Sequence, residues 1–492
     1  MKKIKKVLAL LLSCLLLLTL VACGGGNDND KATDPGKSSD NSARTLKIAA
    51  MQDSGTLHPL GVTGGFVSTL YAFYEPLYDT RADGSRRWIL ATDLERVSDL
   101  QYTLKLREGV TFSNGNPFTA EDVMFTMELC KENPQFALNV KAVDFEKTKI
   151  IDEYTIDLWY TEYNAAQEPG FASMLIMDKE SYDEVALSRT PIGTGPYVVT
   201  DYVVNSHLKA TARDDYWGGE PGIKNIEFKI INEDSQLVNA LETGEVDMAR
   251  VPIAEIDYVK SLGYNVNVNK AGYNDVVLFS LLPGNPLESK EARWAICHAI
   301  DREAIIDVVY EGNSTVTDYP ASHSLIDFEE RFRNMHETYS LGYDPERARE
   351  LAEKSGLVGK TLRIITNGAS NYTTMAEIIQ ANLLDIGVNA EIINYDQATY
   401  FGVLMDASNF EIALFGPSAP SMLAVDIMAM YLTFIPLGWS GPERDLYGEI
   451  SMKALTTYDP EERADLLYEA LEIFVDYTPW YGLCESVGAR AE

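Results

Sequence analysis

The stretch from residue 361 to residue 395 reads TLRIITNGASNYTTMAEIIQANLLDIGVNAEIINY. Thr361–Thr366 is a short apolar run that predicts a strand, and Val388–Tyr395 predicts a second one. Between them the pattern predicts a helix that begins at Thr373 or the residue after it and stops at Gly387. A strand, one helix and a strand form a βαβ unit, whose strands lie parallel with a right-handed crossover.

The segments on both sides of this unit continue the alternation of helices and strands. Asp344 opens a helix that Gly356 ends, because proline suits the first helical position and glycine suits the left-handed end. The run FEIALF at Phe410–Phe415 predicts a further strand. Asp459 opens a long helix that Pro479 closes. This half of the chain is therefore expected to be a doubly wound α/β lobe.

Three loops of this lobe follow strands of the expected sheet. In open sheets of this kind, ligands bind outside the carboxyl ends of the parallel strands. The loops are Asn367–Tyr372, Tyr395–Asp396 and Phe415–Ser418. We expect at least one of them to contact a ligand, and the alternative is that they are ordinary polar turns.

The first half of the chain has a different pattern. Thr45–Ala50 predicts a first strand, and Gln101–Leu106 and Tyr154–Tyr160 alternate apolar and polar residues as half-buried strands do. Thr119 is placed to cap a helix whose first turn is acidic. Residues 71–190 are therefore expected to form a mixed α+β unit.

The first 22 residues have the pattern of a signal peptide. Four lysines precede the apolar run Val7–Ala22, which is too short to span a membrane. The run ends in LVA directly before Cys23, which matches the bacterial lipobox, where the thiol is acylated and becomes the mature N-terminus. The alternative is an ordinary signal peptide followed by an incidental cysteine.

Residues 23–44 predict a flexible tether behind that lipid anchor. Gly24–Ala43 has no large apolar side chain, so it cannot bury enough surface to fold. Acyl chains such as palmitate on Cys23 would hold the folded part near the membrane. The expected location is therefore the extracytoplasmic face of the cell membrane.

The chain is strongly acidic, with a formal net charge of −33. Loss of residues 1–22 removes four lysines, so the mature charge is −33 − 4 = −37. This charge argues against binding to nucleic acid or directly to anionic lipid. The remaining ~450 residues correspond to about three domains of ~150 residues each.

Motifs for catalysis, metals or nucleotides are absent from the sequence. The five histidines lack H-x-H and H-E-x-x-H spacing. Gly359-Lys360-Thr361 imitates the end of a P-loop, but the helix that would cradle phosphate does not follow. No G-x-S-x-G elbow occurs, and Cys130, Cys297 and Cys484 show no C-x-x-C spacing. We therefore expect no cofactor and no metal, and an odd cysteine count leaves the disulfide state open.

An ordered set of segments resembles the family-5 extracellular solute-binding proteins, a group with dipeptide-, oligopeptide- and nickel-binding receptors. The resemblance covers essentially all of residues 45–492, and the order of the segments is more specific than any one of them. The segments are FYEPLYD (73–79), DGSRRWILATDLERVSD (83–99), YTLKLREGVTFSNGNPFTAEDV (102–123), IGTGPYVV (192–199), RDDYWGGEPGIKNIEF (213–228), ALETGEVDMA (240–249) and RWAICHAIDREAII (293–306).

The resemblance implies an α/β fold of the two-lobed periplasmic-binding-protein type, with an extra inserted α+β domain. The ligand would be enclosed between the lobes when they close at the hinge. ABC permease and ATPase subunits would be the partners, and the receptor is expected to be a monomer. The implied boundaries are 45–70, 191–272 and 469–492 for lobe I, 71–190 for the inserted domain, and 273–468 for lobe II.

One departure from the family pattern concerns the ligand. Peptide-binding members usually follow the strand equivalent to FEIALF with a Gly-Trp segment and an aspartate that pairs with the peptide amine. Here residues 415–420 read FGPSAP, and both the tryptophan and that aspartate are missing. A buried ammonium without a carboxylate is costly, so either Asp396 or Asp53 substitutes or the ligand is not a free-amine peptide. The expected ligand-binding residues are Asp53, Ser54, Asn371, Tyr372, Tyr395, Asp396, Phe415, Pro417 and Ser418.

The sequence thus predicts the substrate-binding lipoprotein of an ABC importer, which captures a di- or oligopeptide or a similar small polar solute. Alternatives are the same receptor role for a nickel chelate, an opine or a sugar, an exported hydrolase, and a sensor that reports the ligand to a membrane partner. Because the sequence ends soon after Ala489, we also expect the last strand of the family to be absent or supplied differently.

Overall fold

The computed structural model describes most of the chain after residue 44, which forms one compact unit. The predicted signal peptide, tether and Cys23 lie outside the described residues. Within the described part, no helix is both long and apolar enough to cross a membrane. The described residues are 45–51, 53–62, 66–81, 85–166, 171, 174–317, 321–332, 335–339, 341–417, 423–433 and 437–492.

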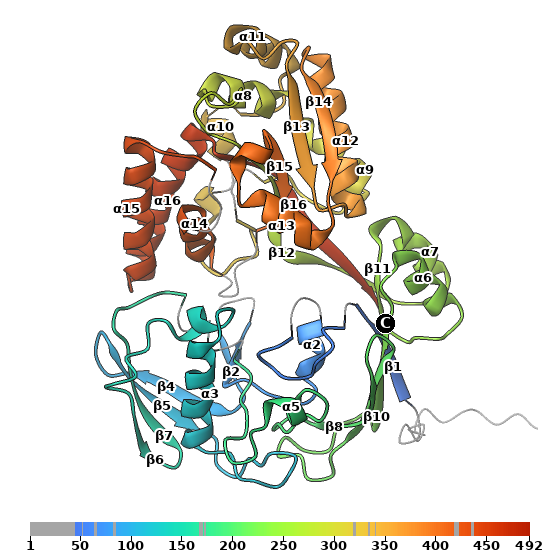
Figure 1. Cartoon of the computed structure of the whole chain (residues 1–492), viewed down its shortest axis with the longest axis vertical. Coiled ribbons are helices and arrows are strands. Elements are labelled where there is room, and N and C mark those ends of the chain that lie inside the picture. The colour runs from blue at the N-terminus through green and yellow to red at the C-terminus, as the bar shows by residue number, and fades with distance from the viewer. Residues whose placement is uncertain are drawn as a thin grey trace, which may run out of the picture. The chain divides into compact units, whose positions relative to one another are not determined.

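A four-stranded sheet contains the predicted first strand. Its order is β1-β10-β9-β8, with β1 parallel to β10 and the other pairs antiparallel (Figure 1). Alternate residues of β9 and β10 are buried against Phe73 and Tyr74, which gives this sheet a core of its own. Its elements are β1 (Thr45–Ala50), β8 (Tyr197–Val203), β9 (His207–Ala212) and β10 (Asn225–Ile230), with the short helices α2 (Val67–Leu70) and α5 (Glu184–Leu187).

A second, antiparallel sheet lies within residues 71–190, where the sequence predicts an α+β unit. Its order is β4-β5-β7-β6, and it shares a separate apolar core with helix α3. Thr119 caps α3 as expected, and the side chain of Asp122 closes a capping box. The elements are β2 (Tyr78–Thr80) and β3 (Arg86–Trp88), which pair as a hairpin, and β4 (Ala91–Arg96), β5 (Gln101–Leu106), α3 (Ala120–Glu132), β6 (Lys149–Asp152) and β7 (Thr155–Trp159).

The third sheet has six strands in the order β11-β16-β12-β15-β13-β14. Strand β13 is parallel to both β14 and β15, which confirms the predicted βαβ unit. Strand β12 is antiparallel to β15 and β16, so the sheet is mixed. The strands are β11 (Ala249–Val251), β12 (Val266–Phe279), β13 (Thr361–Thr366), β14 (Asn389–Asn394), β15 (Ile412–Phe415) and β16 (Trp480–Ala491).

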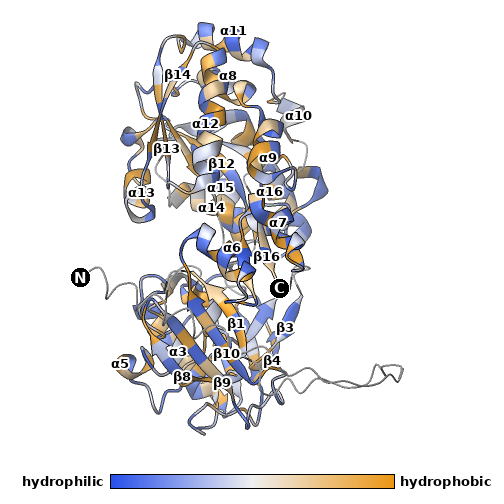
Figure 2. Ribbon diagram, turned by 90° about the vertical axis from the view of Figure 1, so that its right-hand side faces the viewer, coloured by the Kyte–Doolittle hydropathy of each residue, from blue (hydrophilic) through white to orange (hydrophobic). Residues whose placement is uncertain are grey.

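The helices around this sheet begin and end largely at the predicted residues. Asp344 caps α11 and Gly356 ends it with φ +73°, while Asp459 caps α16 through two backbone N–H groups. In Figure 2 the outer helix α11 is mostly hydrophilic. The helices are α6 (Asp234–Glu242), α7 (Ile256–Ser261), α8 (Lys290–Ala299), α9 (Arg302–Tyr310), α10 (Met335–Tyr339), α11 (Pro345–Ser355), α12 (Ser370–Asp385), α13 (Gln397–Leu404), α14 (Ala424–Thr433), α15 (Pro442–Thr456) and α16 (Pro460–Tyr477).

The start of α12 differs from the expectation. The helix begins at Ser370, three residues before the predicted Thr373, so Asn371 and Tyr372 lie in its first turn and not in a loop. The Asn367 side chain accepts a hydrogen bond from the N–H of Ala369 at 3.1 Å, which turns the chain into the helix early. The predicted ligand loop is therefore shorter.

Strands β12 and β16 are long and pass from one apolar core to another (Figure 1). One end of the pair packs with α6 and α7, and the other end lies in the core of the six-stranded sheet. The last described strand, β16, pairs with both β11 and β12, and the expectation that the last strand of the family is absent or supplied differently stays a prediction. Residues 470–484, which the predicted boundaries assign to lobe I, contribute to the large core of the six-stranded sheet, and the boundaries stay a prediction.

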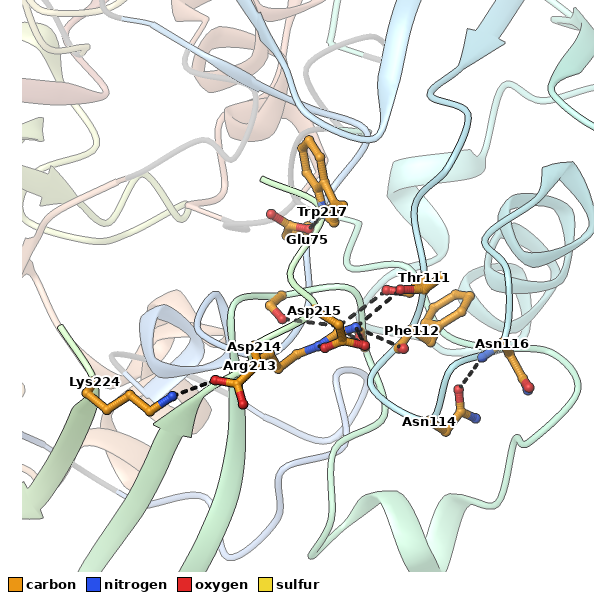
Figure 3. A network of polar contacts seen from close by, with 12 residues as sticks. Glu75, Thr111, Phe112, Asn114, Asn116, Arg213, Asp214, Asp215, Trp217 and Lys224 are labelled. Carbon is orange, nitrogen blue, oxygen red and sulfur yellow. Dashed lines mark hydrogen bonds and ion pairs between the residues drawn. The ribbon is translucent and has the colours of Figure 1, made fainter. Parts of the chain in front are cut away.

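Arg213 joins the four-stranded sheet to the inserted domain (Figure 3). Its side chain is 2% exposed and pairs with Asp215 at 3.0 Å. The guanidinium also donates to the carbonyl oxygens of Thr111 (3.2 Å), Phe112 (3.1 Å) and Gly193 (3.4 Å). One buried cation thus holds carbonyl groups from two segments that lie far apart in the sequence.

A second close contact lies at the same junction. A Cβ on Gly193 would lie 2.2 Å from the carbonyl oxygen of Phe73, so only glycine allows this approach of the two backbones. Two residues after Phe73, Glu75 accepts a hydrogen bond from Trp217 at 2.8 Å (Figure 3). Glu75 also accepts a hydrogen bond from the Tyr216 hydroxyl at 2.6 Å. Of the aromatic clusters around residues 71–74 and 215–217, Phe73 and Tyr74 are buried in the core, Tyr216 and Trp217 are half-buried against Glu75, and Tyr71 is exposed.

Candidate ligand-binding site

Several predicted ligand-binding residues meet at the carboxyl ends of β13, β14 and β15. Tyr372 is in the first turn of α12, and its hydroxyl oxygen would lie 2.5 Å from a Cβ on Gly416. Phe415, at the end of β15, directly precedes that glycine. Tyr395 follows β14, and its N–H donates to the carbonyl oxygen of Thr366 at 3.0 Å. The structure thus places these aromatic side chains at one edge of the sheet.

The Asp53 carboxylate is already engaged within the fold. It accepts hydrogen bonds from the Tyr202 hydroxyl (2.6 Å) and from the N–H groups of Gly55 (2.8 Å) and Asn205 (2.7 Å). Burial, and then this hydrogen bond to Asp53, raise the pKa of Tyr202 above its usual value. Asp53 therefore fixes the loop after β1 against the β8–β9 hairpin.

The Asp396 carboxylate also has a local role, as the N-cap of α13. It accepts hydrogen bonds from the N–H of Thr399 at 3.1 Å and from the hydroxyl of Thr399 at 2.6 Å. The side chain is exposed. A role for either predicted aspartate in binding an amine stays a prediction.

The other predicted site residues are distributed differently. Ser54 and Asn371 are half-buried, and Pro417 is buried. Ser418 lies outside the described residues, so its place in a site stays a prediction.

Behind Tyr372 lies a buried carboxyl group that the sequence analysis missed. Asp275 on β12 is fully buried and accepts hydrogen bonds from the hydroxyl groups of Tyr310 and Tyr372. The Sγ atom of Cys484 lies 3.9 Å from the same carboxyl group. Burial removes water from the charged form and raises the pKa of Asp275 to about 6. The network ties α9, α12 and β16 to one point on β12.

One feature of the sequence could have indicated the buried carboxyl group of Asp275. Asn274 and Asp275 stand directly before the apolar run Val276–Phe279, and such polar residues are depleted in strands. The pairing of β12 with β16 is irregular on both sides of this pair. Two polar residues at an irregularity between two long strands can indicate a special role. The sequence could not identify the partners of Asp275, because they come from elements far away along the chain.

A second buried carboxylate ties the loop after α9 to β16. Glu485 is 1% exposed, pairs with Lys270 at 2.5 Å and accepts a hydrogen bond from the Ser322 hydroxyl. Burial opposes its ionisation, but these bonds hold the pKa of Glu485 below its usual value. This loop is therefore fixed to the strand that carries Ser486 and Cys484.

A pocket of about 490 Å³ lies between the β2–β3 hairpin and elements of predicted lobe II. Its lining includes residues near 80 and 165 as well as residues 326, 423 and 463, so both halves of the chain contribute to it. Residue 423 is the first described residue after the predicted loop at Ser418. The lining residues are Tyr78, Thr80, Ser85, Arg86, Trp88, Tyr163, Ala165, Ile326, Leu423 and Arg463.

Metal-binding groups do not gather in the described part of the chain. None of its clusters of three or more His, Cys, Asp or Glu side chains could hold a metal ion. Cys130, Cys297 and Cys484 are buried and unlinked.

Comparison with known proteins identifies the protein family of the chain. The model of the bacterial extracellular solute-binding proteins, family 5, matches residues 89–434, more than half of the chain. The chain belongs to this family.

The relatives of this family-5 protein differ in what their names say they bind. Heme-binding protein A of Haemophilus influenzae is 24% identical over 96% of this chain and 92% of its own length. Di/tripeptide-binding protein 1 of Pseudomonas aeruginosa is 27% identical over 61% of each chain. The crystal structure of the ABC transporter substrate-binding protein CtaP from Listeria monocytogenes has a TM-score of 0.80 at 23% identity, covering 91% of this chain and 93% of that one. The similarity to the CtaP structure shows that the two chains share a fold.

Some of the segments that resemble family 5 meet at the domain junction. Phe73, Glu75, Gly193 and Arg213 all come from those segments, and all belong to the contacts of Figure 3 or to the adjoining backbone approach. Four pocket residues also come from these segments, namely Tyr78, Ser85, Arg86 and Trp88. The residues at the sheet edge, Tyr372, Tyr395 and Phe415, lie outside them.

Proposed function

We propose that the chain is the extracytoplasmic receptor of an ABC importer, which captures a peptide or similar small polar solute and delivers it to a permease. Membership in the solute-binding family supports a binding role and not a catalytic one. The observation that carries the proposal is the pocket between the β2–β3 hairpin and elements of predicted lobe II. Closing of two lobes on a solute would use the long strands β12 and β16 as hinges.

The class of solute is proposed from two lines of support. One relative is named for di- and tripeptides, although another is named for heme. Aromatic walls with a few polar groups suit a peptide, whose backbone and varied side chains need apolar contact and few fixed partners. A nickel chelate, an opine or a sugar remains the alternative cargo.

A thermal-shift screen tests the receptor role. Purified protein without its first 44 residues is heated with pools of peptides, metal chelates, opines and sugars. A solute at 100 times its Kd should stabilise the fold by about 2.7 kcal/mol, which gives a readable rise in Tm. The receptor role is contradicted if no pool raises Tm and native mass spectrometry finds no small molecule on protein purified from cells.

We also propose that Cys23 is acylated and holds the receptor at the membrane as a monomer. The signal pattern, the lipobox and the tether support this. An anchor keeps a receptor at high local concentration near its permease. Cys23→Ser should abolish fatty-acid labelling and membrane retention in cells while solute binding by the purified protein is unchanged. Equal labelling of the mutant and the wild type would contradict the anchor.

A further inference from the structure

The glycine after β15 packs directly against two tyrosine side chains. Gly416 follows Phe415, the last residue of β15. A Cβ on Gly416 would lie 2.5 Å from the hydroxyl oxygen of Tyr372 and 2.7 Å from a ring carbon of Tyr273. The two rings come from different elements, the first turn of α12 and the long strand β12. The position of the chain at Gly416 therefore depends on where these two tyrosines are held.

Both tyrosines are linked to the buried carboxyl group of Asp275. The Tyr372 hydroxyl donates directly to this group. The Tyr273 hydroxyl is hydrogen-bonded to the hydroxyl of Ser486, which is in turn hydrogen-bonded to Asp275. The Tyr310 hydroxyl also donates to Asp275 and lies 3.2 Å from the hydroxyl oxygen of Ser486. One carboxyl group on β12 therefore holds both side chains that contact Gly416.

Hydroxyl and thiol groups face the Asp275 carboxyl. Two cations near it are engaged with other groups: Lys270 pairs with Glu485 at 2.5 Å, and Arg302 donates to a backbone carbonyl oxygen at 3.2 Å. Burial raises the pKa of Asp275 to about 6. The titratable and charged groups on the surrounding elements are Tyr310 and Arg302 of α9, Tyr372 of α12, Cys484 and Glu485 of β16, Tyr273 and Lys270 of β12, Arg250 of β11, and His323 of the loop after α9.

We propose that Asp275 is a positioning residue for the loop after β15, which it holds through Tyr273 and Tyr372 more firmly when it is protonated than when it is ionised. A carboxylate buried away from water is costly, so ionisation favours arrangements in which the tyrosines separate and water reaches the charge. Such an opening frees the chain at Gly416. The inference rests on the proposed receptor role, because this loop is one of those expected to contact the solute.

Hydrogen–deuterium exchange of the purified protein, with no solute added, tests the proposal. Exchange is followed by mass spectrometry at pH 5, 6 and 7 in peptides that contain Phe415 and Gly416, and is corrected for the chemical exchange rate at each pH. An opening that hydrates Asp275 returns it to an ordinary pKa of about 3.9, so the opening constant should rise roughly tenfold between pH 5 and pH 7. Peptides around Gly193, at the other junction, should show no such rise.

Three variants locate the effect. Asp275→Asn should abolish the rise with pH, because an amide has no proton to lose in this range. Tyr372→Phe should increase exchange near Gly416 at least threefold at pH 5, because the hydroxyl that links the loop to the carboxyl is gone. The matched control is Tyr447→Phe, since this buried hydroxyl donates to the carbonyl oxygen of Met428 at 2.7 Å. It should leave exchange near Gly416 unchanged, and thermal denaturation checks that each variant is folded.

Three results would overturn the positioning role of Asp275. The first is exchange near Gly416 in the wild type that does not change with pH. The second is an equal rise in all protected peptides, which would mean that the whole fold opens and not this loop. The third is a rise that persists in Asp275→Asn. Each of these leaves the receptor role standing, because that role is tested by added solutes and this experiment contains none.

Discussion

At the scale of single residues, the buried Asp275 makes stability depend on pH. Its pKa is raised to about 6 in the folded chain, whereas an unfolded chain has an ordinary aspartate value of about 3.9. The folded state binds this proton more tightly, so the free energy of unfolding should fall as pH rises from about 4 through 6. The two-unit difference corresponds to roughly 3 kcal/mol. Asp275→Asn should remove this fall.

Urea unfolding of the wild type and Asp275→Asn at pH 4, 5, 6 and 7 measures the effect. The mutant should gain stability relative to the wild type as pH rises. The control is Asp178→Asn: burial opposes the ionisation of Asp178, but hydrogen bonds from Ser181 and from two asparagines lower its pKa. Its contribution is lost only as pH falls below about 4, the ordinary pKa of an unfolded aspartate, so its difference curve should be nearly flat between pH 4 and 7. The prediction would be contradicted if the difference in free energy of unfolding between Asp275→Asn and the wild type did not change with pH.

At the scale of elements, the close approach of two segments at Gly193 should be intolerant of any side chain. A Cβ there would lie 2.2 Å from the carbonyl oxygen of Phe73, which is backbone and cannot rotate away. Gly193→Ala must therefore shift one of the segments that Arg213 holds. We expect a loss of about 3 kcal/mol or more in the free energy of unfolding, as for other severe core changes.

The matched control is Gly402→Ala. Gly402 lies in α13, where a Cβ would meet no atom within 4 Å. Alanine favours a helix over glycine by roughly 0.5–1 kcal/mol, so this variant should be slightly more stable than the wild type. Chemical denaturation monitored by circular dichroism measures both. Equal effects of the two substitutions would show that the approach at Gly193 is not tight.

At the scale of the whole molecule, the inserted domain contacts the turn between α15 and α16 away from the long strands. The Arg96 guanidinium carbon lies 3.7 Å from the ring centroid of Tyr458, and the N–H of Ala165 donates to the carbonyl oxygen of Leu455 at 2.8 Å. A cation–π contact of this kind contributes about 1 kcal/mol. Arg96→Ala should therefore shift the balance toward open arrangements by about fivefold.

Small-angle X-ray scattering measures this shift as a larger radius of gyration for Arg96→Ala. Lys105→Ala is the control, because Lys105 lies on the neighbouring strand β5 and is half exposed. Tyr458→Ala also removes the edge-to-face contact of its ring with Tyr163, so its increase should be at least as large, and adding Arg96→Ala to it should give no further increase. An unchanged radius in both single variants would show that this contact does not hold the two parts together.

The sequence by itself determined the local elements of this protein. The caps at Thr119, Asp344 and Asp459 stand where the structure has them, because a cap is made by a side chain and the backbone two or three residues further on. The parallel strands β13, β14 and β15 follow from the same local patterns together with the handedness of the crossover. The family pattern was also readable, since it reports the junction around Arg213.

Only the tertiary structure decided which side chains meet. Asp53 is one of two aspartates that the sequence offers as a substitute for the amine-binding carboxylate, but the fold places three hydrogen-bond donors around it. Asp275 meets Tyr310 and Tyr372, and Tyr78 shares a pocket with Arg463, across sequence separations that no local pattern encodes. The physical reason is that burial and charge at a site are set by the packing of distant segments, whereas helices, strands and caps are set by neighbours along the chain.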